Sequence, residues 1–177
     1  PWTHLRMVDC TVDVLSPTCP LTDATSLVAL TVTTNTTDPS FHFPRGLTCL
    51  FLRVIDSQLS AALLTQLTNL QDLSVVTGSN PKPCDLSPLT SLTHFFAASF
   101  PVSRLPTSLF ELCLEIESDC DFSPLTRLTE LRLSTKPHLR ATFPTQLKEL
   151  CMRCGVLNES NVADLLLESF ESIEHPL

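Results

Sequence analysis

The chain has 177 residues, 43% of them hydrophobic, which is enough apolar material for one substantial core and too much for a disordered chain. Its formal net charge of -8, from 19 acidic against 11 basic residues, would repel a phosphate backbone and an anionic membrane surface, so nucleic acid is not expected as a partner. With 3 glycines against 14 prolines, proline, aspartate, asparagine and serine must make the turns, which argues against a hairpin-rich β-barrel.

Leucines recur along the whole chain at intervals that indicate a repeat. Most are followed three and five residues later by further apolar residues, which gives the pattern L-x-x-L-x-L. This alternation has the period of two expected of a short strand with one buried face. The sequence therefore predicts eight or nine short strands that stack in parallel. The first apolar residue of each copy, here called its anchor, is Leu5, Leu27, Leu47, Leu70, Leu92, Leu109, Leu128, Leu147 or Phe170.

The segments between the predicted strands are long enough to cross the back of a coil and return. Ser87-Pro88 and Ser123-Pro124 can each start a single helical turn, with serine as the cap and proline at the first position. The shorter copies, 105–109 and 143–147, leave room only for an extended or 3-10 return. Longer helices are expected at 59–67 and 160–170.

Two segments, CDLSPLTSLTHF at 84–95 and CDFSPLTRLTEL at 120–131, are near copies of each other. Together with the L-x-x-L-x-L cores they resemble leucine-rich-repeat proteins, and in particular the internalin-like repeat D-[LIF]-S-P-L-x-x-L-T-x-L. The segment LPTSLFEL at 105–112 is similar to the short repeats of bacterial effector proteins. The resemblance implies an α/β leucine-rich-repeat solenoid, with a curved parallel sheet on its concave face and short helical, 3-10 or irregular returns on its convex face. Residues 1–177 would form one domain of about eight to nine repeats, and we leave open that it is a fragment of a longer chain.

One position departs from the family pattern. Leucine-rich repeats usually carry asparagine eight residues after the anchor, where its amide satisfies backbone groups. Here only Asn35 fits, and a uniform asparagine ladder is not expected. The remaining residues at this position are Asp13, Ile55, Gly78, Phe100, Glu117, Lys136 and Gly155.

The resemblance also implies that the residues two and four positions after each anchor point outward from the concave face. Two large aromatic residues on such a strip are unusual, and they are candidate anchors for a partner unless a neighbouring loop covers them. Three glutamates fall in one column, where a basic partner could use them, although a solvated and salt-bridged face explains them equally well. The candidate partner-binding residues are Phe51, Asp72, His94, Phe96, Glu111, Glu130, Arg132 and Glu149.

No catalytic or metal-binding motif is present. The five histidines are scattered over different copies, without an H-E-x-x-H or G-x-S-x-G motif. Cys19, Cys84 and Cys120 each lie eight residues before an anchor and are expected to be small buried residues. Cys151 and Cys154 form a close pair without a second pair, so neither zinc nor another cofactor is expected.

The sequence therefore predicts a non-catalytic scaffold that binds a partner protein, with a basic or apolar patch, through its concave face. Two alternatives stay open: the substrate-recognition part of a larger enzyme, such as an effector-type ubiquitin ligase, or a repeat of a surface adhesive array. We find no signal peptide and no apolar run long enough to span a membrane, so no membrane insertion is expected and a cytoplasmic location is favoured. The identity of the partner and the oligomeric state stay open.

Overall fold

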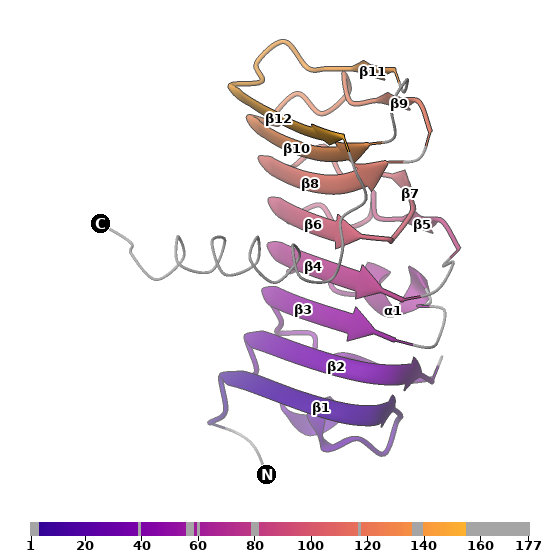
Figure 1. Ribbon diagram of the computed structural model, residues 1–177. Coiled ribbons are helices and arrows are strands. Elements are labelled where there is room, and N and C mark those ends of the chain that lie inside the picture. Colours follow the sequence, from indigo (N-terminus) through magenta and orange to yellow (C-terminus); the bar gives the residue numbers. More distant parts are fainter. Residues whose placement is uncertain are drawn as a thin grey trace.

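A computed structural model describes residues 4–38, 40–55, 59, 61–78, 82–116, 118–135 and 140–154. In these residues the chain winds into a parallel β-solenoid, whose stacked turns build one eight-stranded sheet (Figure 1). The strands of this sheet, in spatial order, are β1 (Met7–Leu15), β2 (Ala29–Thr37), β3 (Cys49–Val54), β4 (Asp72–Thr77), β6 (His94–Ala98), β8 (Glu111–Ile116), β10 (Glu130–Thr135) and β12 (Glu149–Cys154). All neighbours in the sheet run parallel.

Each of these eight strands begins two residues after an anchor, as the leucine pattern predicts. The alternation of exposure along a strand is the cause: in β3 every second side chain is buried and those between are half-buried. The ninth predicted anchor, Phe170, and the helix predicted at 160–170 lie outside the described residues.

The core is formed by rows of apolar side chains that run from coil to coil. The residues three positions after the anchors stand opposite one another in register, because the strands pair without a slip. Burying one such leucine stabilises the fold by roughly 1.5–3 kcal/mol, so each coil depends on its neighbours. This inner row contains Leu30, Leu50, Leu73, Phe95, Leu112, Leu131 and Leu150, all but Leu150 almost fully buried.

The returns on the other side of the coils contain little helix. Where the structure describes them, they hold a 3-10 segment η1 (Pro20–Asp23), one five-residue helix α1 (Ala61–Thr65) and two small parallel pairs. In these pairs β5 (Cys84–Asp85) lies beside β7 (Val102–Arg104), and β9 (Cys120–Asp121) beside β11 (Ala141–Thr142). The described part is thus mainly β, and the expected α/β character is weak. Among these elements, no helix is both long and apolar enough to cross a bilayer.

The two serine-proline segments form hydrogen-bonded turns instead of the predicted helical turn. The carboxylate of the preceding aspartate accepts the serine backbone N–H, at 2.9 Å from Asp85 to Ser87 and at 3.0 Å from Asp121 to Ser123. Hydrogen bonds from the side chain and then the backbone of Ser87 lower the pKa of Asp85, and hydrogen bonds from the hydroxyl of Thr142 and then from Ser123 lower the pKa of Asp121. The N–H groups that a capping serine would accept, those of Leu89 and Leu125, bond instead to the carbonyls of Leu86 and Phe122, both at 3.0 Å.

Two buried threonines satisfy backbone carbonyl groups near the ends of strands β2 and β4. Thr34 is buried and donates its hydroxyl to the carbonyl of Thr36 at 2.8 Å. Thr77, at the same position two coils later, is also buried and donates to the carbonyl of Ser99 at 2.6 Å. Both threonines lie seven residues after an anchor, one residue before the position at which leucine-rich repeats usually carry asparagine.

Candidate functional site

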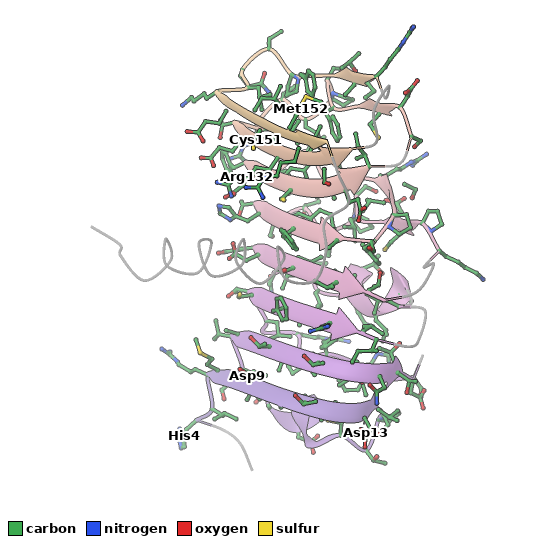
Figure 2. All side chains as sticks on the ribbon, in the orientation of Figure 1. His4, Asp9, Asp13, Arg132, Cys151 and Met152 are labelled. Atoms are coloured by element: carbon green, nitrogen blue, oxygen red, sulfur yellow. The ribbon has the colours of Figure 1, made fainter. Side chains whose placement is uncertain are left out.

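The candidate site is the open face of the sheet, which we define as the face formed by the side chains two, four and six positions after each anchor. Alternate residues of a strand point to opposite sides of a sheet, so these side chains point away from the inner row. All eight candidate residues lie on this face. The register places Asp72, His94, Glu111, Glu130 and Glu149 in one column and Phe51, Phe96 and Arg132 in the next. Figure 2 labels Arg132 and Cys151 toward one end of the sheet and Asp9 toward the other.

Asp72 and His94 form a hydrogen-bonded pair on neighbouring strands, which becomes an ion pair when His94 is protonated. Nδ1 of His94 lies 2.7 Å from Oδ1 of Asp72 and 2.9 Å from the hydroxyl of Thr93. The hydrogen bond to Asp72 raises the pKa of His94, while partial burial opposes the shift and the charges of Asp72, Glu111 and Glu130 add to it. The pair holds both side chains in place at the start of β4 and β6.

Arg132 lies between two glutamates of the acidic column. Its Nη1 atom is 3.2 Å from Oε1 of Glu111, and its Nη2 atom is 3.9 Å from Oε2 of Glu130. One arginine therefore relieves the repulsion between carboxylates on adjacent strands, which is the salt-bridged arrangement considered for this face. Glu149 stands opposite Glu130 in the register and is exposed.

Phe51 and Phe96 lie on either side of Ser74, because β4 separates β3 from β6. Both rings are half-buried, so part of each faces solvent on the open face. The Oγ atom of Ser74 is buried and has no hydrogen-bond partner in the described part of the chain. The sequence indicated the two phenylalanines as candidate binding residues. It did not single out Ser74, although the leucine spacing places this serine in the same column.

Three of the shielded thiols, those of Cys49, Cys84 and Cys113, are unsuited to nucleophilic chemistry. Burial, followed by the charge of Asp72, raises the pKa of Cys49 to about 11. Burial likewise raises the pKa of Cys113 and Cys84 to about 11. Such thiols stay protonated near neutral pH, and the thiolate is the reactive form. Within the described ranges, no three histidine, cysteine or acidic side chains are grouped so as to hold a metal ion.

A second feature that sequence reasoning missed lies at the end of β6. Ser99 has a left-handed backbone, with φ at 54°, and both its N–H and its hydroxyl lie 3.3 Å from Oε2 of Glu115. Ser99 lies in the interval from Leu92 to Leu109, which is the shortest between two anchors. A non-glycine residue in this region is strained, and Glu115 on the open face supports it.

Comparison with protein-family models, curated proteins and solved structures yields no match for this chain. The function must therefore be argued from the open face. That face combines two half-buried aromatic rings, a column rich in carboxylates and one arginine that bridges two of them.

Proposed function

We propose that the chain is a leucine-rich-repeat scaffold that binds another protein through the open face of its sheet and catalyses no reaction itself. One observation carries the proposal: the candidate residues from β3, β4, β6, β8, β10 and β12 lie in two adjacent columns on one continuous face. The L-x-x-L-x-L pattern, with a strand starting two residues after every described anchor, supports the assignment to leucine-rich repeats.

The mechanism is the rigid presentation of side chains at fixed intervals. Neighbouring strands in a sheet lie about 4.8 Å apart, so the partner meets groups at set positions. Contacts within the face, such as Asp72 with His94 and Arg132 with Glu111, order these side chains before binding. Ordering a long side chain at an interface costs about 0.5–1.5 kcal/mol, and preorganisation reduces this cost.

The chemistry of the face favours a partner with a basic and apolar surface. Aromatic residues contribute strongly to binding when the partner buries them, and Phe51 and Phe96 are positioned for this. The acidic column beside them attracts a cationic surface and speeds encounter at low salt. Glu149, exposed at one end of this column, extends the charged strip along the sheet.

Affinity capture with the intact chain tests the proposal. Proteins retained by the wild type are compared by quantitative mass spectrometry with those retained by the double variant Phe51→Ser with Phe96→Ser. The matched control is Phe143→Ser, which removes a half-buried ring from the return side, where it stacks 6.5 Å from Phe122. Thermal unfolding of all three proteins establishes that they are folded.

We expect at least one partner to be retained by the wild type and the control and to be lost from the double variant. Retention of every partner by the folded double variant would show that the open face around β3 and β6 is not the binding site.

A further inference from the structure

The inner row of apolar side chains is exposed at the last described coil, residues 140–154. Leu131 and Leu133 on β10 are almost fully buried, because their strand lies between β8 and β12. Their counterparts on β12, Leu150 and Met152, are 46% and 48% exposed, and β12 is the outermost strand at this end of the sheet (Figure 1). We call the side chains of Leu150 and Met152, with the half-buried anchor Leu147, the end surface.

An end surface of this kind is unfavourable in water. Burying one leucine or methionine side chain is worth roughly 1.5–3 kcal/mol, and an exposed apolar patch favours association with other chains. Solenoids therefore end in a segment whose outer side is polar. The occupant of the end surface must offer an apolar face to Leu150 and Met152 and a polar face to water.

The chain itself supplies such a segment shortly after β12. Residues 160–170, for which the sequence predicts a helix, carry apolar residues at the spacing of one helical face. These residues are Val162, Leu165, Leu166 and Phe170. Asp164 and Glu168 fall on the opposite face of the same helix. The segment is thus amphipathic in the sense that the end surface requires.

Phe170 is also the ninth predicted anchor, but a ninth coil fits the end surface less well than a helix. In each described copy the residue five positions after the anchor is apolar, and on β12 this residue is Met152. The corresponding residue after Phe170 is His175, a polar residue where Met152 needs an apolar neighbour. A helix instead brings four apolar side chains to the end surface.

Length and charge support the same occupant. A helix over 160–170 is about 16 Å long, close to the roughly 20 Å of the strand β12. Residues 155–159 reach up to about 17 Å, which lets the chain turn back from the end of β12. The last coil carries three basic residues against one acidic residue, whereas 155–177 carries five acidic residues and no lysine or arginine. The two parts of the chain therefore attract each other.

We propose that residues 160–170 form an amphipathic helix that packs its apolar face on the end surface and caps the solenoid. The helix covers Leu150 and Met152 and turns Asp164 and Glu168 to solvent. This contact is made within one chain and lies at the end of the sheet, so the inference does not rest on the proposed binding through the open face.

Methionine oxidation measures this cover, because the two methionines of the chain lie on the first and last strands of the sheet. Met7 on β1, which is 73% exposed, is the internal reference, and Met152 is the probe. The intact chain is treated with hydrogen peroxide under native conditions, and oxidation of each methionine is followed in its proteolytic peptide by mass spectrometry. With the cap, Met152 should be oxidised at least about fivefold more slowly than Met7, whereas the described exposures alone predict rates within about twofold.

Two adjacent leucines give a matched set of variants. Leu166→Ser places a hydroxyl in the apolar face, and we expect it to raise the oxidation rate of Met152 severalfold. Leu167→Ser makes the same change about 100° around the helix and should leave this rate as in the wild type. Leu167→Pro costs about 3 kcal/mol in a helix interior, so it should expose Met152 although Leu167 does not face the end surface. Oxidation of Met7 should be the same in all four proteins.

Oxidation of Met152 within twofold of Met7 in the wild type overturns the cap, and this comparison decides the matter even where a variant fails to fold. Equal effects of Leu166→Ser and Leu167→Ser overturn it as well, and so does protection of Met152 that survives Leu167→Pro. Protection that disappears when the protein is diluted would assign the end surface to a second copy of the chain and also overturn the helix. Protection that is independent of concentration, with the three variants behaving as expected, supports it.

Discussion

Replacement of Gly78 by alanine tests how closely adjacent coils approach. Gly78 follows β4 and donates its N–H to the carbonyl of Val54 at 3.0 Å. A Cβ atom at this position would lie 2.4 Å from the carbonyl oxygen of Ile55, a backbone atom of the preceding coil. The obstructing atom belongs to the coil stack itself, so relief requires the strands to separate. Such overpacking costs about 1–3 kcal/mol.

Alanine has less conformational freedom than glycine in the unfolded chain, so the variant loses less entropy on folding. This effect offsets about 0.4–1 kcal/mol of the cost. The midpoints of the two ranges leave a net loss of about 1.3 kcal/mol, which corresponds to a fall in the melting temperature of roughly 3–5 °C for a chain of this size. The melting temperature is measured by circular dichroism, and the free energy of unfolding by urea titration.

Gly46→Ala is the matched control. Its added Cβ would meet the carbonyl oxygens of Leu27 and Thr25 at 3.3 Å, a contact that shifts of a few tenths of an ångström relieve. We therefore expect its stability to stay within about 0.5 kcal/mol of the wild type. If both variants were equally stable, the inference that adjacent coils pack closely at the end of β4 would be wrong.

Three further predictions follow from burial and from the charged pair. Leu50→Ala should reduce the free energy of unfolding, measured by urea titration, by about 2–5 kcal/mol, because the Leu50 side chain is almost fully buried between neighbouring coils. A loss under about 1 kcal/mol would contradict the burial of Leu50 in the inner row. His94 should titrate above its ordinary pKa of 6.5 by NMR, and Asp72→Asn should remove the shift. Because the pKa of His94 is raised in the folded state, its protonation stabilises the fold fully below about pH 6.5, and this contribution is lost as the pH rises through the folded-state pKa. If the free energy of unfolding of Asp72→Asn depended on pH in the same way as that of the wild type, the pairing of Asp72 with His94 would be refuted. In a thiol-modification assay at mildly alkaline pH, exposed Cys151 should react well before buried Cys113, whose pKa is about 11; equal rates would contradict their placement.

The spacing of the leucines was sufficient to predict where the strands begin and which residues share a face. This succeeds because burial of every second side chain fixes both the strand and its register, and a slip of one residue would expose the whole inner row. Leu50 and Leu131 lie opposite Leu73 and Leu112 for this reason. The expected placement of Phe51 in the column of Phe96 follows from the same rule.

The returns and the side-chain contacts could not be predicted in the same way. The serine-proline turns depend on Asp85 and Asp121, whose side chains compete locally with helix formation. The predicted helix at 59–67 is reduced to the five residues of α1, a length at which helix hydrogen bonds alone give little stability. The bridge made by Arg132 depends on its rotamer, which the sequence pattern does not determine.

The most direct test of the proposed binding face is carboxyl footprinting of the chain with and without a captured partner. Carbodiimide labels exposed carboxylates, and the chain offers chemically similar groups on its two sides. Asp72, Glu130 and Glu149 lie on the open face, whereas Asp85 and Asp121 lie in the return strands β5 and β9. We predict that the partner lowers the labelling of the first three and leaves the last two unchanged. Protection of Asp85 and Asp121, with undiminished labelling of the open face, would contradict the account.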